Sequence, residues 1–310
     1  MLGQIKGLHH VTSMAANAHI NNSFFTHTLG LRRVKKTVNF DAPDVYHLYY
    51  GDEVGTPGSV MTYFPFPHIA RGRPGTGEVG KTLFSVPEGS LKFWETRLAA
   101  SGVEILKKDT TFGESRLHFS GPDGDGFALV EVKDDPRTSW TGNGVGEDHA
   151  IRGFHSAVLR LRDEGATAEL LKFMGYRKID TRDDVLRFGI ADGNGADFID
   201  IEVIPGGDGA RLGAGSVHHL AFSVEDQAKQ LEVRKALMDT GYNVTPVIDR
   251  DYFLAIYFRT PGGVLFEVAT NEPGFDRDED GAHLGQALKL PVQHAHLRSM
   301  LESHLEPLDA

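Results

Sequence analysis

The chain has no cysteine among its 310 residues, and this absence removes several kinds of chemistry at once. Disulfide bonds, thiolate metal sites and cysteine nucleophiles are excluded, so any bound metal must be held by histidine and carboxylate side chains. No window approaches the roughly 18 uncharged apolar residues of a membrane-spanning helix, so we expect no membrane partner. The start of the chain, MLGQIKGLHHV, lacks the basic and then apolar layout of a signal peptide, which favours a cytoplasmic protein.

Basic residues are scarcer than acidic ones. Lysine and arginine total 32, and aspartate and glutamate total 43, which gives a net charge of −11 at pH 7. The phosphate backbone of a nucleic acid would repel such a chain at long range, so no nucleic-acid partner is expected. The hydrophobic and charged fractions, 40% and 24%, are typical of globular proteins, and the length favours two domains.

The most informative feature is internal repetition. GSVHHLAFSV, from Gly215, aligns without a gap with GEVGKTLFSV, from Gly77, and GLHHVTSM, from Gly7, aligns with GFHSAVLR, from Gly153. Each segment runs into a helical stretch that ends at a glycine, the residue type that best adopts the left-handed backbone just past a helix. These glycines are spaced 72, 73 and 66 residues apart, at Gly30, Gly102, Gly175 and Gly241.

Each repeat therefore has the pattern strand–helix–strand–strand–strand. A single unit of about 60 residues has a sheet with one apolar face and nothing to cover it, so two units must pack together. We predict an α+β fold in which four βαβββ modules pair into two domains. The predicted divisions are an N-terminal domain at 1–140 with modules at about 5–66 and 77–134, a C-terminal domain at 150–270 with modules at about 151–205 and 213–270, and a tail at 271–310.

The tail contains a predicted helix in the stretch PVQHAHLRSMLESHLEPL. Its apolar residues recur at helical spacing on one face, so we expect it to dock on the body of the protein. These residues are Leu297, Met300, Leu301 and Leu305.

Two pairs of adjacent histidines stand at corresponding places in the repeats. His9-His10 opens the first module and His218-His219 opens the fourth, whereas the second has Gly80-Lys81 and the third has His155-Ser156. Adjacent side chains on a strand face opposite ways, so only one member of each pair can face a given cavity. We take the second members, His10 and His219, as the inward ones.

A carboxylate lies in the middle of the apolar strand VLFEVAT, at Glu267. Such a group is costly unless it is paired or bound to a metal. It could be paired with one of two arginines near it in the sequence, Arg250 or Arg259. Glu131, in GFALVEV, occupies a similar place in the second module, which indicates that the acidic residue is partly a feature of the repeat.

His10, His219 and Glu267 together make a set of two histidines and one carboxylate. Such a set occupies one face of an octahedral metal and leaves positions open for substrate and oxygen. With a divalent cation the site keeps one positive charge, which favours an anionic oxygen ligand such as a phenolate.

Paired βαβββ units with a metal at their junction resemble the vicinal oxygen chelate superfamily, also called the glyoxalase/bleomycin resistance/extradiol dioxygenase superfamily. More narrowly, four segments in this order resemble the ring-cleaving dioxygenases of the hydroquinone and chlorohydroquinone type: GLHHVT, SVHHLAFSV, DRDYFLAIYFRTPGGVLFEVAT and LGQALKLPVQH. The resemblance spans nearly the whole chain. It implies two domains of curved mixed sheets and an enzyme that cleaves a small aromatic diol with O2.

By this resemblance, His10, His219 and Glu267 ligate Fe(II), with Mn(II) as the alternative metal that such a set also accepts. The catechol extradiol dioxygenases take all three ligands from the second half of the chain. Here the third module has Ser156 at the ligand position, so the site would join the first and fourth modules, as in the hydroquinone branch.

Five further residues match positions around the metal or in contact with substrate in that branch. The resemblance implies that His218 accepts the proton of a substrate hydroxyl and that Arg250 or Tyr257 stabilises a developing negative oxygen. The full set is His9, Thr12, His218, Arg250 and Tyr257.

Three alternatives remain open at this stage. One is a catechol extradiol dioxygenase, and another is a glyoxalase-type metal-dependent lyase or isomerase, which usually has a second carboxylate ligand. The segment at the matching place, SVMTYF from Ser59, contains no acidic residue, which favours the oxygenase. The third is a non-enzymatic protein that sequesters a small molecule, although such chains normally have two modules and no metal set. The sequence leaves open whether the protein is a homo-oligomer.

Overall fold

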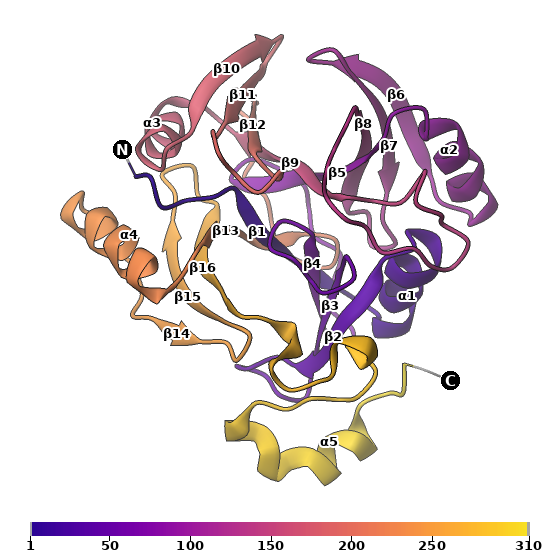
Figure 1. The fold of residues 1–310 in the computed structure, drawn as a ribbon. Coiled ribbons are helices and arrows are strands. Elements are labelled where there is room, and N and C mark those ends of the chain that lie inside the picture. The colour runs from indigo at the N-terminus through magenta and orange to yellow at the C-terminus, as the bar shows by residue number, and fades with distance from the viewer. Residues whose placement is uncertain (1, 309–310) are drawn as a thin grey trace.

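The computed structural model describes residues 2–308, and within them each repeat forms a βαβββ module (Figure 1). The first module consists of β1 (Leu8–Ala15), α1 (Ala18–Ser23), β2 (Arg32–Val38), β3 (Tyr46–Gly51) and β4 (Val60–Pro65). The second consists of β5 (Glu78–Pro87), α2 (Leu91–Ala100), β6 (Ile105–Thr111), β7 (Glu114–Ser120) and β8 (Gly126–Val132).

The two modules in the second half of the chain repeat this order. The third consists of β9 (Gly153–Leu161), α3 (Gly165–Phe173), β10 (Arg177–Arg182), β11 (Val185–Gly189) and β12 (Phe198–Val203). The fourth consists of β13 (Val217–Val224), α4 (Gln227–Asp239), β14 (Ile248–Asp249), β15 (Phe253–Arg259) and β16 (Leu265–Pro273). The predicted α+β fold of four βαβββ modules is therefore confirmed.

The modules combine into two eight-stranded mixed sheets. The strand order of the first sheet is β14-β15-β16-β13-β1-β4-β3-β2, and that of the second is β10-β11-β12-β9-β5-β8-β7-β6. The first sheet thus joins the fourth module to the first, and the second joins the third to the second, through the antiparallel pairs β1–β13 and β5–β9.

These sheets do not follow the predicted division into domains at 1–140 and 150–270. The segment 66–77 leads from the first sheet to the second, and the segment 205–215 leads back beside it, joined by isolated β-bridges. Repetition in a sequence identifies the modules, but it carries no information about which two modules share a sheet, so the predicted pairing needs this correction.

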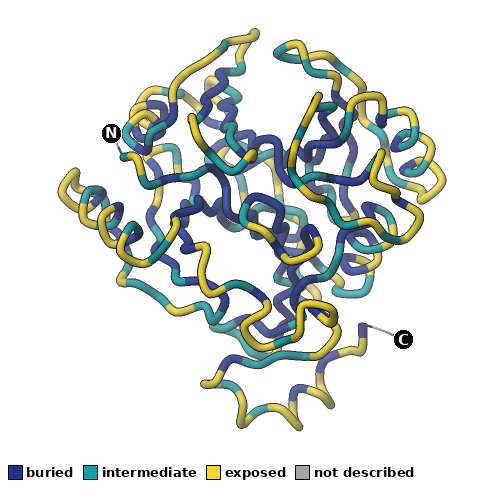
Figure 2. Tube along the Cα trace, in the orientation of Figure 1, coloured by how far each residue is buried: buried dark blue, intermediate teal, exposed yellow. Residues whose placement is uncertain are grey.

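Apolar residues from the helical part of every module anchor it to its sheet. Because burying a large apolar side chain stabilises a fold by roughly 1.5–3 kcal/mol, these anchors fix the helices on the outer sides of the sheets. The anchors are Phe25, Trp94, Leu171 and Leu237, all fully buried in one core. Figure 2 shows the central strands of both sheets buried and the outer faces of the helices exposed.

The tail packs beside β2 through a bridge between Lys36 and Leu288. The predicted helix is shorter than expected, because a 3-10 segment at Val292–Leu297 precedes α5 (Arg298–His304). The prediction that the tail docks on the body is confirmed for Leu301 and Leu305, which are buried. Met300 is 48% exposed and does not belong to the docked face. Within residues 2–308, no helix has the length and apolar character needed to cross a membrane.

Candidate metal centre

Three neighbouring central strands of the first sheet bring His10 (β1), His219 (β13) and Glu267 (β16) together. The two Nε2 atoms lie 3.2 Å apart, and they lie 3.4 Å and 2.9 Å from Glu267 Oε2, for His10 and His219 respectively. All three residues are buried, and one ligand atom of each lies within 4.8 Å of the others. Residues more than 200 positions apart in the sequence thus converge on one point.

The residue before His10 holds the His10 ring in one tautomer. His9 Nε2 lies 3.1 Å from the carbonyl oxygen of Thr270, which can only accept, so this nitrogen carries the proton. Burial and then the neighbouring His10 ring lower the pKa of His9 to about 3, so the ring is neutral and its Nδ1 is an acceptor. His10 Nδ1, 2.9 Å away, therefore donates to it, which leaves the lone pair of His10 Nε2 facing Glu267.

Within residues 2–308, the carboxylate of Glu267 lies close to the two imidazoles but makes no hydrogen bond of good geometry. Neither oxygen has a well-aligned hydrogen-bond donor within residues 2–308. Burial raises the pKa of Glu267, but the positive charge that the His10 and His219 imidazoles can carry outweighs burial and brings that pKa well below its usual value, so the group is charged. A buried charge without donors costs several kcal/mol, and a divalent cation among these three groups removes that cost. The residues present therefore fit a divalent metal.

Both histidine pairs lie at β-bulges of the central strands. In the register of β1 with β13, His9 and His218 are the extra residues, each skipped between paired neighbours. A bulge changes the direction in which adjacent side chains point, and the Nδ1 atoms of His218 and His219 lie 2.8 Å apart. The prediction that one member of each pair faces a given cavity is wrong in the fourth module, because both rings line the same cavity.

A cavity of about 460 Å³ opens above the three residues. Such a volume suits a small ligand, and the walls are mainly aromatic, which suits a planar ring. Besides His10, His219 and Glu267, the lining includes Phe40, Phe64, Phe66, Phe253, Tyr49, Tyr257, His47, His218, Arg250, Asn39 and Asp41.

Arg250 and Tyr257 form one polar wall of the cavity. Arg250 Nε donates to the Tyr257 hydroxyl over 3.3 Å, and the guanidinium lies over the rings of Tyr257 and Phe40. Burial raises the pKa of Tyr257 well above 10, with a further contribution from the charge of Glu267, so the phenol stays neutral. Two predicted residues thus bring a cation and a hydroxyl to the wall of the cavity.

His218 presents a neutral imidazole to the same space. It lines the cavity and is partly exposed, and its ring lies edge-on to Phe64. Burial and then the adjacent His219 lower the pKa of His218 to about 4. A neutral imidazole at the cavity wall can accept a proton from a ligand.

The other two predicted residues do not line this cavity. His9 lies behind His10, where it holds the ring. Thr12 is fully buried in the sheet, and its hydroxyl accepts a hydrogen bond from Thr62 over 2.9 Å. Both support neighbouring side chains in the structure and are not positioned to touch a ligand.

Two lining residues of β3, His47 and Tyr49, were not predicted from the sequence. A signal existed, because they alternate along the strand YHLYYG and so share a face. In addition, Tyr49 pairs with Thr62 in the first module as Tyr257 pairs with Glu267 in the fourth. Applying the repeat to the third strand of each module would have found them.

The same register identifies the counterparts of Glu267. Glu267 pairs with the residue two positions after His219. The residue that pairs at the same distance from the histidine position is Thr62 in the first module and Ala128 in the second. The prediction that Glu131 occupies this place is therefore wrong. Glu131 accepts a hydrogen bond from the backbone of Leu91 at the start of α2. The first module thus has a threonine, Thr62, at the position where a fourth carboxylate ligand would stand.

Comparisons with known proteins identify the family. A family model described as Glyoxalase/Bleomycin resistance protein/Dioxygenase superfamily matches residues 7–268. MhqO of Bacillus subtilis (strain 168), which carries the provisional name of a ring-cleaving dioxygenase, is 41% identical over 310 residues, 100% of this chain and 98% of MhqO. Chlorohydroquinone/hydroquinone 1,2-dioxygenase of Sphingobium indicum is 34% identical over 300 residues, 94% of this chain and 92% of that protein.

Solved structures show the same fold. A crystal structure of a provisionally named dioxygenase from Bacillus subtilis has a TM-score of 0.95 at 40% identity, covering 99% of this chain and 98% of that one. Glyoxalase I from Zea mays has a TM-score of 0.63 at 15% identity, covering 86% of this chain and 92% of that one, which shows the fold alone. These matches confirm the resemblance inferred from the repeats and the histidine pairs. The chain belongs to the Glyoxalase/Bleomycin resistance protein/Dioxygenase superfamily.

Proposed function

We propose that this protein is an Fe(II)-dependent ring-cleaving dioxygenase that acts on hydroquinone-type substrates with O2. The observation that carries the proposal is the placement of His10, His219 and Glu267 at the floor of an aromatic-lined cavity. The relatives over nearly the full chain include one named for chlorohydroquinone and hydroquinone, which supports the substrate class. Mn(II) is the alternative metal for the same donors.

In this proposal His10, His219 and Glu267 hold the metal, which when bound supplies Lewis acidity toward a substrate hydroxyl and open positions for oxygen. His9 keeps the His10 lone pair pointed at that position by accepting from His10 Nδ1. Such support from residues behind a ligand typically changes metal affinity by about 10–100-fold.

His218 is the residue that accepts the substrate proton. Its ring is neutral, partly exposed and on the cavity wall beside the ligand His219. A phenolic proton moves to this imidazole as the substrate oxygen takes up negative charge. The protonated ring beside the developing anion then also stabilises it.

Arg250 and Tyr257 stabilise the negative charge that develops when His218 takes the substrate proton. The guanidinium is held by Tyr257 and by Asp41, whose Oδ2 lies 3.3 Å from Arg250 Nη1. A fixed cation and a neutral hydroxyl in an aromatic-lined cavity stabilise negative charge on the reacting oxygen atoms. The surrounding phenylalanine rings orient a planar substrate and exclude water.

The glyoxalase-type alternative is less well supported by the site. It calls for a carboxylate from the first module, and Thr62 stands at that place, bonded to Thr12 and His47. A sequestering protein would not need a charged Glu267, beside two imidazoles and without a well-aligned hydrogen-bond donor in residues 2–308, at the floor of its cavity.

The test is anaerobic loading of the protein with Fe(II), followed by oxygen-uptake traces with hydroquinone, chlorohydroquinone and catechol. We expect about one bound iron per chain and oxygen uptake that is fastest with the hydroquinones. A parallel lyase assay with a glutathione hemithioacetal should show no turnover. Iron-loaded protein that consumes no oxygen with any dihydroxybenzene would refute the proposal.

A further inference from the structure

A chain of four hydrogen-bonded side chains crosses the first sheet and ends at the cavity, outside the metal set. Tyr49 Oη lies 2.8 Å from His47 Nδ1, His47 Nε2 lies 2.9 Å from Thr62 Oγ1, and Thr62 Oγ1 donates to Thr12 Oγ1 over 2.9 Å. All four residues are buried, and two of them, Tyr49 and His47, also line the cavity.

The direction of each proton follows from the far end of this chain. Because the Thr62 hydroxyl donates to Thr12, its oxygen must accept from His47, so His47 Nε2 carries the ring proton. The neutral ring then has a lone pair on Nδ1, which accepts the Tyr49 proton. Burial first, and then the nearby His10, lower the pKa of His47, which agrees with a neutral ring.

The consequence is that the hydroxyl oxygen of Tyr49, a residue that lines the cavity, has lone pairs but no proton to offer a ligand. Its one proton is committed to His47, and burial raises the pKa of Tyr49 well above 10, so the phenol does not ionise. The ring is fixed by Phe275 and Tyr252, with centroids 5.1 Å and 6.2 Å away. Tyr49 is therefore a rigid acceptor that selects a ligand group able to donate.

The strand that carries Tyr49 is separated from the strand that carries His10. β3 lies beyond β4, two strands from β1, so its backbone is about 10 Å from that of His10 at the usual strand spacing. A ring with two adjacent hydroxyls would place both near the metal. A ring with hydroxyls at opposite ends can place one near Glu267 and direct the other toward Tyr49.

We propose that Tyr49 is a specificity-determining residue whose oxygen accepts a hydrogen bond from the second, distal hydroxyl of a hydroquinone-type substrate. His47 is the positioning residue that keeps the Tyr49 proton turned away from the cavity. This inference rests on the proposed function and adds the chemical reason for preferring a free hydroxyl opposite the reacting one.

The test compares hydroquinone with 4-methoxyphenol, whose ether oxygen cannot donate, on the iron-loaded protein. Dissociation constants are measured without oxygen by calorimetry, and KM and kcat with oxygen. Wild-type protein should bind hydroquinone about 10-fold more tightly than the ether, the worth of one such hydrogen bond. Tyr49→Phe should reduce this ratio to about twofold, mainly by raising the dissociation constant and KM of hydroquinone.

The matched control is Tyr50→Phe, the same change on the next residue of β3. Tyr50 faces the other side of the sheet, where its hydroxyl donates to Asn21. This variant should keep the wild-type ratio. Thermal melting of both variants separates a loss of selectivity from a loss of folding.

A second variant tests the role of His47. His47→Leu removes the acceptor of the Tyr49 proton, so the Tyr49 hydroxyl becomes free to donate into the cavity. Binding of 4-methoxyphenol should then improve relative to hydroquinone, a shift that general loosening of the cavity would not produce. An unchanged ratio in Tyr49→Phe would overturn the inference. If iron-loaded wild type shows no oxygen uptake, the proposed function fails, while the binding ratio still reports on Tyr49.

Discussion

Each of the two sheets has a buried carboxylate at its centre, at equivalent positions of the third and fourth modules. The two sheets balance the charge of this carboxylate in different ways. In the third module Ser156 replaces the histidine, and the register of β9 with β12 puts Asp200 where the fourth module has Glu267. Arg187 pairs with Asp200 across β11 and β12, as Tyr257 pairs with Glu267 across β15 and β16. A carboxylate therefore occupies the same position in both sheets.

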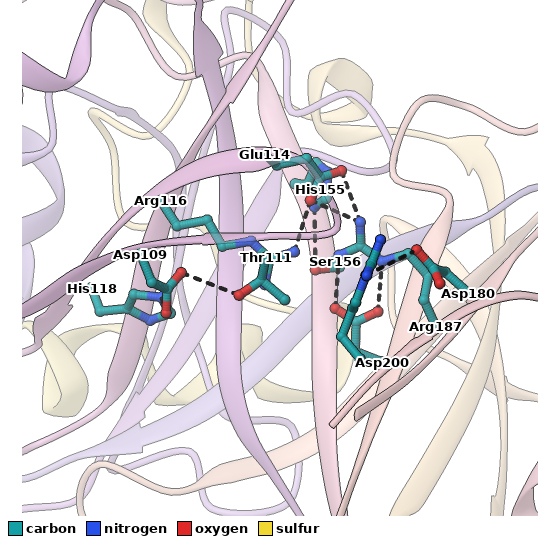
Figure 3. Close-up of polar contacts among 11 residues, drawn as sticks. Asp109, Thr111, Glu114, Arg116, His118, His155, Ser156, Asp180, Arg187 and Asp200 are labelled. Atoms are coloured by element: carbon teal, nitrogen blue, oxygen red, sulfur yellow. Dashed lines mark hydrogen bonds and ion pairs between the residues drawn. The ribbon is translucent and has the colours of Figure 1, made fainter. Parts of the chain in front are cut away.

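In the second sheet the balancing cation is part of the chain. Arg187 holds Asp200 through two bonds of 2.8 Å and also donates to Glu114 (Figure 3). His155, at the bulge position of its module, lies 3.0 Å from Glu114 Oε1. The Arg187 guanidinium also lies over the ring of Phe112, 4.2 Å from its centroid.

The comparison identifies the residues that distinguish a centre balanced within the chain from the candidate metal centre. Where the second sheet has Arg187 and Ser156, the first has Tyr257 and His219, and within residues 2–308 neither oxygen of Glu267 has a well-aligned hydrogen-bond donor. The first sheet thus gives up internal charge balance, and a metal can restore it.

The largest expected effect comes from neutralising each carboxylate in turn. Glu267→Gln should lower metal affinity by more than about 100-fold and abolish oxygen uptake, and His219→Ala should do the same. Asp200→Asn should keep metal and uptake but lower the free energy of unfolding by about 3 kcal/mol, because Arg187 loses a buried partner. Metal content after dialysis and denaturant unfolding measure the two outcomes. Equal metal loss in both variants would contradict the distinction between the sheets.

The two bulge histidines provide the next test. His218→Ala should retain the metal but lower kcat by about 10²–10⁴-fold, the usual range for a general base. His155→Ala, at the same repeat position in the second sheet, should leave kcat unchanged and reduce stability by removing a partner of Glu114. Loss of metal in His218→Ala would instead mean that the wrong member of the pair was assigned as ligand.

The sequence was sufficient for the modules and for the convergence of His10, His219 and Glu267. Each of these residues stands out against its repeat or its apolar strand, so the signal is local. The two histidine pairs can also be recognised locally in the sequence. The backbone bulges that let His218 and His219 share a cavity cannot be predicted from the sequence of residues.

The parts that could not be predicted depend on contacts between distant segments. The pairing of β1 with β13, and of β5 with β9, depends on which edges of the modules' sheets come together. The residue patterns of the strands do not determine it. Glu131 was misplaced because similar strand sequences, VLFEVAT and GFALVEV, align in more than one register. Register to the neighbouring strand, which only the fold provides, resolves the difference.

Removing the built-in cation should make the second centre resemble the first. In a Glu267→Gln background, Arg187→Ala should cost about 3–5 kcal/mol of unfolding free energy by leaving Asp200 and Glu114 without their partner. Added Zn(II) should recover part of this loss, about 2.7 kcal/mol at one hundred times its dissociation constant. Arg182→Ala, a change at an exposed arginine of β10, is the control and should show neither effect. Absence of metal-dependent recovery would show that the two centres are not interchangeable.

The smallest effect concerns the acid sensitivity of the second centre. Burial raises the pKa of Glu114, but its bonds and charge interactions with His155 and Arg187 outweigh burial and bring the net value below the ordinary 4.5. Because the folded pKa is below the unfolded one, this stabilisation is complete above about pH 4.5 and is lost as the pH falls toward the folded value. Glu114→Gln should therefore lower the melting temperature at pH 7 by several degrees, at about 2–4 °C per kcal/mol, and this deficit should shrink below pH 4. The exposed change Glu88→Gln should show no such pH-dependent deficit, and a Glu114→Gln deficit that persisted undiminished at pH 3 would mean that charge is not what Glu114 contributes.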